Sequence, residues 1–124
     1  STTPEVVPVL SGIVHPQLGR ALRAMHGAPG RGWSLDTLAR EAALSRTAFA
    51  RTFHELVGQP PMSYLTRLRM QRARVLLRGD ASTAAIGEQV GYRSEAAFHR
   101  AFKKAFGLGP GAYRRGVRSS VGDR

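Results

Sequence analysis

The stretch SEAAFHRAFKKAFGLGPGAYR, residues 94–114, decides the fold, because it predicts one capped amphipathic helix. Ser94 is a preferred N-cap residue, and Glu95 suits the positive end of a helix dipole. Apolar side chains recur at three- and four-residue steps, at Phe98, Ala101, Phe102, Ala105 and Phe106. Gly107 then ends the helix and Pro110 prevents its continuation. The stretch therefore predicts a short helix with a buried aromatic face.

The opposite face of this helix is cationic, in keeping with the chain as a whole. It carries His99, Arg100, Lys103 and Lys104. The chain has 19 lysines and arginines against 8 acidic residues, a formal net charge of +11, and all of the cations except Lys103 and Lys104 are arginines. Guanidinium groups donate to phosphates and to guanine edges, so the composition predicts a nucleic-acid partner.

Composition also narrows the class of protein. The 124 residues, 42% of them hydrophobic, are enough for one or two small folded domains. The chain has no cysteine, which excludes disulfides and thiolate metal sites. No apolar run approaches the roughly 20 residues that span a bilayer, and the N-terminus has no signal-peptide core, so we expect a cytoplasmic protein.

Helix start and stop signals divide the rest of the chain. Ser34 and Ser45 predict the N-caps of two short helices separated by a three-residue joint, which is typical of a helix-turn-helix. A long run of apolar residues and arginines then predicts a linking helix. The expected segments are an arm at 1–14, a first helix-turn-helix subdomain at 15–61, the linking helix at 62–78, a second subdomain at 79–115 and a flexible tail at 116–124. We therefore predict an all-α fold of about seven helices.

An internal repeat supports two subdomains. With an offset of 49, residues 45–64 and 94–113 are identical at eight of twenty positions, where average composition gives roughly one or two. The identical pairs are Ser45/Ser94, Ala48/Ala97, Phe49/Phe98, Arg51/Arg100, Phe53/Phe102, Gly58/Gly107, Pro61/Pro110 and Tyr64/Tyr113. Upstream of the joint the offset becomes 48, which pairs Leu38 with Ile86 and Ala42 with Val90. The repeat predicts a duplicated helix-turn-helix whose copies are each too small to be stable alone.

Residues 16–115 resemble the DNA-binding domain of the AraC/XylS family of bacterial transcription regulators. The matching segments are LAREAALSRTAFARTFHELVGQPPMSYL at 38–65, LRMQRARVLL at 68–77 and VGYRSEAAFHRAFKKAFGLGPGAYR at 90–114. The sequence departs from the family at Ala43, where the first turn usually carries Gly, and at Gly87, where the fifth helix usually carries Ala. We expect either departure to loosen its unit locally, and a left-handed Ala43 to cost about 1–2 kcal/mol.

The resemblance implies two recognition helices that enter consecutive major grooves, about 34 Å or 10 base pairs apart. In the first copy the exposed early positions are Arg46, Thr47, Ala50 and Arg51, of which the resemblance assigns base reading to the last three. The equivalent positions in the second copy are Glu95, Ala96, His99 and Arg100. The expected phosphate contacts are Ser45, Arg93, Ser94, Lys103, Lys104 and Arg114.

The chemistry of these side chains suggests individual roles. Arg51 suits a bidentate contact to guanine, and Ala50 or the methyl group of Thr47 suits a thymine methyl. Glu95 has two readings, as an acceptor from cytosine N4 and as a helix-dipole residue, which leaves Arg100 as the stronger candidate in the second copy. We expect Arg51 to contribute more to sequence discrimination than Arg100.

Other function classes have weaker support in the sequence. The four histidines, His15, His26, His54 and His99, are scattered without metal-ligand spacing, and we expect no catalysis, metal or cofactor. The alternative function is a basic helical module that binds an acidic protein, which should tolerate lysine in place of Arg51 and Arg100. RNA binding would need exposed aromatic platforms, whereas the four repeated phenylalanines are phased towards the core.

Family resemblance also suggests partners beyond double-stranded DNA. Relatives commonly carry a domain that senses an effector, so we expect one elsewhere in a longer protein, and RNA polymerase is a partner to consider. The segments Phe49–Arg51 and Val57–Leu65 resemble members fused to a cupin-like sensor. The 124 residues themselves are expected to be monomeric.

Overall fold

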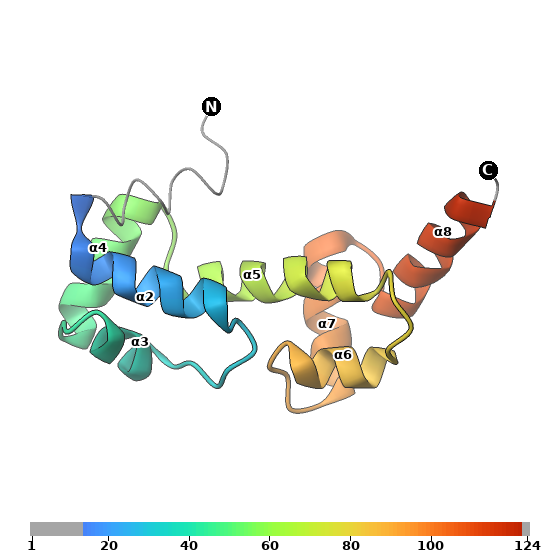
Figure 1. Cartoon of the computed structure of the whole chain (residues 1–124), viewed down its shortest axis with the longest axis horizontal. Coiled ribbons are helices and arrows are strands. Elements are labelled where there is room, and N and C mark those ends of the chain that lie inside the picture. Colours follow the sequence, from blue (N-terminus) through green and yellow to red (C-terminus); the bar gives the residue numbers. More distant parts are fainter. Residues whose placement is uncertain (1–13, 123–124) are drawn as a thin grey trace. The chain divides into compact units, whose positions relative to one another are not determined.

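Seven α-helices and no strand occur in the part of the chain that the computed structural model describes, residues 14–122 (Figure 1). In order they are α2 (Pro16–Gly27), α3 (Leu35–Glu41), α4 (Arg46–Val57), α5 (Pro61–Leu76), α6 (Thr83–Gln89), α7 (Glu95–Phe106) and α8 (Pro110–Gly122). This confirms the predicted all-α class. The arm expected at 1–14 lies outside the described residues, apart from Val14.

Two compact units divide the chain between Thr66 and Arg67, inside α5 and inside the predicted linking helix. In the first unit α2, α3 and α4 surround an apolar core. Its fully buried side chains include Leu18, Met25, Leu38, Phe49, Phe53 and Leu65. The Phe53 ring meets the Tyr64 ring edge-on at 5.5 Å, and the Tyr64 hydroxyl lies 2.6 Å from His26 Nε2. The start of α5 is thereby fixed to the first unit.

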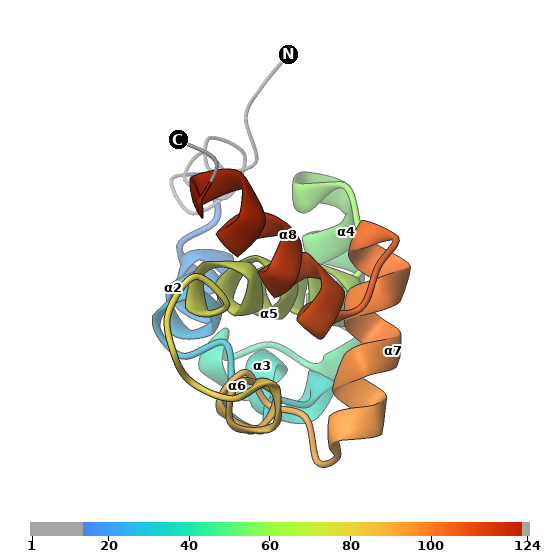
Figure 2. The same ribbon diagram turned by 90° about the vertical axis from the view of Figure 1, so that its right-hand side faces the viewer.

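The second unit repeats this architecture. Figure 2 shows the rest of α5 with α6, α7 and α8 around it. Its core contains Met70, Ala73, Leu77, Ile86, Val90, Phe98 and Phe102. Phe102 lies between Phe98 and Tyr113, with ring centroids 5.9 and 5.5 Å away. The predicted buried face is confirmed at Phe98 and Phe102, and Phe106 packs on Phe102 at 4.7 Å but is only half-buried. Ala105, predicted on the same face, is exposed because it lies at the edge of the stripe.

The repeat also includes the helix that precedes each helix-turn-helix motif, which the comparison of the two sequences did not align. Buried residues of α2 at Leu18, Ala21 and Met25 have the same spacing as Met70, Ala73 and Leu77 at the end of α5. Only Ala21 and Ala73 are identical, so identity alone could not align the two sets. The equal spacing of the buried residues indicates that α2 and the end of α5 have equivalent places in the two units.

Serine hydroxyls cap the four helices of the two helix-turn-helix motifs, as the sequence predicted for Ser34, Ser45 and Ser94. Each accepts a hydrogen bond from the amide three residues later, at 3.2 Å for Ser34 and 3.1 Å for Ser45, Ser82 and Ser94. Such a cap stabilises a helix by about 1 kcal/mol. The caps fix the first residue of both α4 and α7, whose early turns carry the candidate reading residues.

The turn between the two helices of each motif has the same hydrogen bonds in both units. The Leu44 amide donates to the Ala39 carbonyl at 3.0 Å, and the Tyr92 amide donates to the Gly87 carbonyl at 2.9 Å. This is the six-to-one bond of a Schellman motif, which requires a left-handed residue one position earlier. Gly91 fills that position with φ of 104°, and Ala43 fills it with φ of 56°.

Ala43→Gly is expected to stabilise the first unit by about 0.5–1 kcal/mol. The exchange removes about 1–2 kcal/mol of left-handed strain and adds about 0.5–1 kcal/mol of glycine entropy. Urea unfolding followed by the fluorescence of the single tryptophan, Trp33, which is buried in this unit, measures the change. Ala48→Gly, the same exchange inside α4, should instead lose about 1 kcal/mol. A loss of stability in Ala43→Gly would contradict the account of strain.

Gly87 does not loosen the second unit, contrary to the sequence-based expectation. It is buried in α6 against Phe98, and a β-carbon placed on it would lie 2.9 Å from Phe98 Cδ2 and 3.0 Å from Phe98 Cβ. Ordinary carbon contacts are about 3.5–4.0 Å. Glycine therefore allows α6 and α7 to approach closely.

Residues 116–122 are helical, so the flexible tail expected at 116–124 is wrong over that part, while 123–124 lie outside the described residues. Side chains of α8 explain the difference. Arg114 Nε donates to the Leu77 carbonyl at 3.0 Å, and Arg118 Nη2 donates to the Gly79 carbonyl at 3.2 Å. These guanidinium groups satisfy free carbonyls at the end of α5, where the helix dipole is negative.

Candidate nucleic-acid interface

The outer face of α4 holds the four early positions of the first unit that are candidates for base reading. Arg46, Thr47 and Arg51 are exposed and Ala50 is half-buried. They line one side of an open groove, together with Leu35, His54 and Glu55. The sequence analysis did not select these last three, although His54 and Glu55 follow Arg51 at helical spacing. The fully buried Phe49 and Phe53 hold the opposite face of α4 in place.

The two arginines of this face differ in their contacts. Arg46 Nε lies 3.2 Å from Asp36 Oδ1 at the start of α3, with the two side chains 65% and 51% exposed. An exposed pair of this kind contributes at most about 1 kcal/mol, but it orients Arg46. Arg51 forms no ion pair with another residue of 14–122. Arg51 is thus the cation of α4 that is available to a partner.

The outer face of α7 presents the equivalent residues of the second unit, Glu95, Ala96, His99 and Arg100, all exposed. Glu95 Oε2 accepts a hydrogen bond from Thr83 Oγ1 at 2.9 Å and lies 3.6 Å from His99 Nε2. Glu95 therefore links the starts of α6 and α7, a role that the sequence did not suggest. Arg100 has no ion pair in the described part of the chain.

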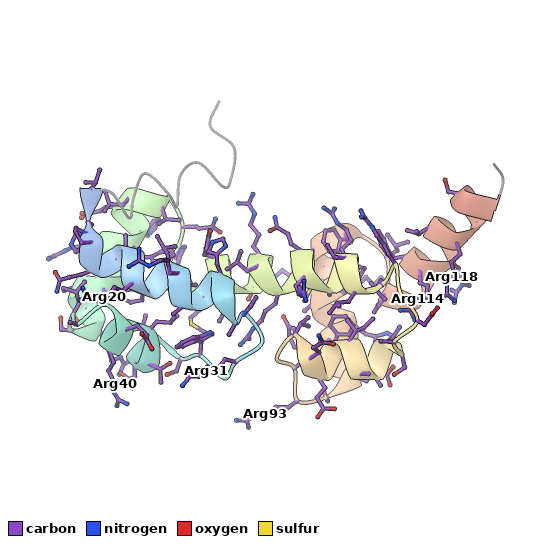
Figure 3. All side chains as sticks on the ribbon, in the orientation of Figure 1. Arg20, Arg31, Arg40, Arg93, Arg114 and Arg118 are labelled. Atoms are coloured by element: carbon purple, nitrogen blue, oxygen red, sulfur yellow. The ribbon has the colours of Figure 1, made fainter. Side chains whose placement is uncertain are left out.

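Five of the six predicted phosphate contacts lie on exposed positions, namely Ser45, Arg93, Ser94, Lys103 and Lys104. Figure 3 shows Arg93 extending away from the turn between α6 and α7. Arg114 is different, because it is half-buried, bonds to the Leu77 carbonyl and has a buried Nη2 without a hydrogen-bond partner. Arg114 serves the fold and does not belong to the candidate interface.

Arg69 is a site residue that the sequence analysis missed. Its guanidinium carbon lies 2.9 Å from where a β-carbon on Gly91 would be, and 6.0 Å from the centre of the Tyr92 ring. Burial lowers the pKa of Arg69 and raises the pKa of Tyr92, and the interaction between the two groups opposes both shifts. Arg69 therefore covers the turn that leads into α7.

The first unit supports its turn in a comparable way. Gln17 Nε2 donates to the Ala43 carbonyl at 3.2 Å, and Arg20 Nε donates to the Glu41 carbonyl at 3.3 Å. In each unit, side chains of the first helix thus hold the turn before the recognition helix. These contacts join residues 21 or more positions apart, so no local sequence pattern indicates them.

Membrane-spanning helices and metal-binding clusters are both absent from the described residues. Among 14–122, no helix has both the length and the apolar character needed to cross a bilayer. Within the same residues, no three histidine, aspartate or glutamate side chains lie close enough together to hold a metal ion.

The amino-acid sequence of the chain is similar to those of known transcriptional regulators. A family model described as a helix-turn-helix domain matches residues 38–116. The RCS-specific HTH-type transcriptional activator RclR of Escherichia coli is 41% identical over 111 residues, which cover 89% of this chain and 39% of that protein. A putative AraC-like transcription regulator of Streptomyces lividans is 44% identical over 107 residues, which cover 86% of this chain and 35% of that protein. The chain thus spans less than half the length of these relatives.

Solved structures share the fold. The DNA-binding domain of the global transcriptional factor AdpA, crystallised in complex with a target DNA, superposes with a TM-score of 0.80 at 30% identity, covering 83% of this chain and 94% of that one. An AraC-type regulator from Chromobacterium violaceum gives a TM-score of 0.74 at 28% identity, covering 84% and 94%. Both the sequence matches and the two helix-turn-helix units lead to one assignment: the chain belongs to the AraC/XylS family of transcriptional regulators.

Proposed function

We propose that this chain is the sequence-specific, double-stranded DNA-binding domain of a bacterial AraC-type regulator. The observation that carries the proposal is the exposed face of α4, where Arg51 has no acidic partner in the described residues and lines an open groove with Thr47 and Ala50. The superposable AdpA domain was crystallised with a target DNA, which supports the same use of this fold.

In this proposal the first turns of α4 enter the major groove. The groove is about 12 Å wide and admits a helix of about 10–12 Å diameter. Arg51 then donates two hydrogen bonds to guanine O6 and N7, while Thr47 and Ala50 contact a neighbouring thymine methyl group. Because Phe49 and Phe53 are fully buried behind them, the backbone of α4 that carries these side chains is held in place.

The second unit uses α7 in the same way, with Arg100 as its main donor to a base edge. Free amides at the starts of α4 and α7, beside Ser45 and Ser94, suit phosphate oxygens. Arg93 precedes the cap of α7 and adds a cation at that end. Lys103 and Lys104 supply cations at the other end of the helix.

We further propose that the two recognition helices occupy consecutive major grooves. Their separation would then be about 34 Å, or 10 base pairs, so that one chain reads an asymmetric pair of half-sites. Bending of the DNA between the half-sites is an alternative way for both helices to reach their grooves. The chain acts as a monomer in this arrangement.

The remaining partners follow from the family. We propose that a sensing domain elsewhere in the full protein responds to an effector, that RNA polymerase is a partner at promoters, and that the protein acts in the cytoplasm. The relatives named above are more than twice as long as the matched region, which leaves room for such a domain.

Selection of bound duplexes from a random pool tests the proposed function. The expected result is enrichment of two blocks of sequence whose centres lie about 10 base pairs apart. A chain with Arg51→Ala should lose the block that α4 reads and keep the other block. A pool that shows no enriched sequence after repeated rounds would refute sequence-specific binding.

A further inference from the structure

The two units differ sharply in charge. Residues 1–66 contain six arginines and four acidic residues, whereas residues 67–124 contain thirteen lysines and arginines and four acidic residues. The second unit therefore carries +9 of the formal net charge of +11. Base reading needs only a few cations at chosen positions, so the duplicated motif alone does not account for this excess.

Some cations of the second unit have roles within the fold. Arg114 and Arg118 bind carbonyls at the end of α5, and Arg69 covers the turn at Gly91. Others lie on α7 or just before it, where base reading and phosphate contacts were predicted. A further group lies on α5, at Arg67, Arg72, Arg74 and Arg78, with Arg78 two residues beyond the helix end.

These four arginines are exposed and have no ion pair with another residue of the described chain. The sequence of α5, PMSYLTRLRMQRARVL, contains no acidic residue that could neutralise them. Arg67 and Arg74 are seven positions apart and share one face of the helix. Their charge is therefore available to an external anion.

Arg74 connects this face of α5 to α7. Its guanidinium carbon lies 5.1 Å from the centre of the ring of Phe106, the last residue of α7. The ring orders the guanidinium group without neutralising it. Lys103 and Lys104 are exposed in the same last turn of α7. We group the exposed cations on this face of α5 and in the last turn of α7, namely Arg67, Arg74, Lys103 and Lys104, as the α5–α7 basic surface.

We infer that the α5–α7 basic surface binds the DNA phosphate backbone and makes the second unit the main source of salt-dependent affinity. This inference rests on the proposed function. A helix that fills a major groove has a phosphate strand along each flank, so cations at its end and on the helix packed against it lie beside such a strand. The weakly charged first unit then contributes mainly discrimination between sequences.

The test compares two charge-matched double variants. R67Q/R74Q removes two cations of the α5–α7 basic surface, and R23Q/R115Q removes two exposed arginines from α2 and α8. Fluorescence anisotropy over a series of KCl concentrations measures binding to the selected duplex and to a scrambled duplex of equal length. Each phosphate contact adds about 0.9 to the slope of log affinity against log salt.

For R67Q/R74Q the slope is expected to fall by about 1.8 on both duplexes, and for R23Q/R115Q by less than half as much. R67K/R74K should keep most of the slope, because a phosphate contact needs the charge. R67Q alone, which leaves the contact of Arg74 with Phe106 intact, should lose about 0.9 and guards against misfolding of the double variant.

Equal slopes for R67Q/R74Q and R23Q/R115Q would overturn the inference, and so would a loss confined to the selected duplex. A slope in R67Q/R74Q that matches wild type would also overturn the inference. The α5–α7 basic surface would then be a candidate binding site for an acidic protein. If the wild-type chain binds neither duplex, or binds both equally, the proposed function fails instead.

Discussion

Arg51→Ala is expected to lower the affinity ratio between the selected site and a scrambled duplex by roughly ten- to a hundredfold. The side chain is exposed on α4, lines the groove beside Thr47 and Ala50, and has no ion pair in the described residues. A bidentate contact between arginine and guanine contributes about 1–3 kcal/mol of discrimination. Competition binding of both duplexes at one fixed salt concentration measures the ratio.

Two matched variants sharpen this prediction. Arg51→Lys keeps the charge but loses the planar pair of donors, so affinity for the scrambled duplex should stay near wild type while the ratio still falls. Arg100→Ala should lower the ratio less than Arg51→Ala, because its neighbour Glu95 accepts from Thr83 and lies 3.6 Å from His99, which leaves fewer groups beside Arg100 free to contact a base. A larger effect at Arg100 would reverse the roles assigned to the two units.

Gly87→Ala is expected to lower the free energy of unfolding by up to about 2 kcal/mol. In an open helix the same exchange would add about 1 kcal/mol, because alanine has the higher helix propensity. Here the new β-carbon would lie 3.0 Å from Phe98 Cβ, an atom that cannot move without shifting α7. Overpacking of a core costs about 1–3 kcal/mol, which exceeds the gain in propensity. Urea unfolding followed by far-ultraviolet circular dichroism measures the difference.

Gly116→Ala provides the control for Gly87→Ala. Gly116 is exposed in α8, and a β-carbon there would meet no atom within 4 Å. Its replacement should raise stability by up to about 1 kcal/mol, as helix propensity alone requires. If Gly87→Ala stabilises the chain to the same extent, the close approach of α6 and α7 is not the reason for glycine at this position.

Local patterns in the sequence predicted most of the helices and the exposure of most candidate site residues. The cap serines Ser45 and Ser94, the buried phenylalanines and the left-handed position of Ala43 all depend on neighbours within a few residues. Hydrogen-bonded caps and helical periodicity act over one or two turns, so a single sequence contains the information. The same range explains why the exposed faces of α4 and α7 could be assigned from their early turns.

Contacts between distant residues account for the predictions that were wrong or missing. Arg114 looked like a phosphate contact because it follows a basic helix, yet it donates to the carbonyl of Leu77. Gly87 was expected to loosen the second unit, yet the absence of a β-carbon there allows Phe98 to pack against α6. In the sequence Arg69 does not differ from the other arginines of α5, whereas in the structure its guanidinium group lies against Gly91. Each role depends on a partner at least eleven positions away in the chain.

The sequence by itself therefore determined that this protein is an all-α pair of helix-turn-helix units, where each helix starts, and which side of each recognition helix is exposed. Periodicity and capping carry that information because they are local. Only the tertiary structure decided which cations belong to the fold and which remain available to DNA, because every exposed arginine has the same charge in the sequence. Packing distinguishes them: a guanidinium group that donates to a free carbonyl stabilises the fold, and one that reaches only solvent or an aromatic ring remains available to a partner.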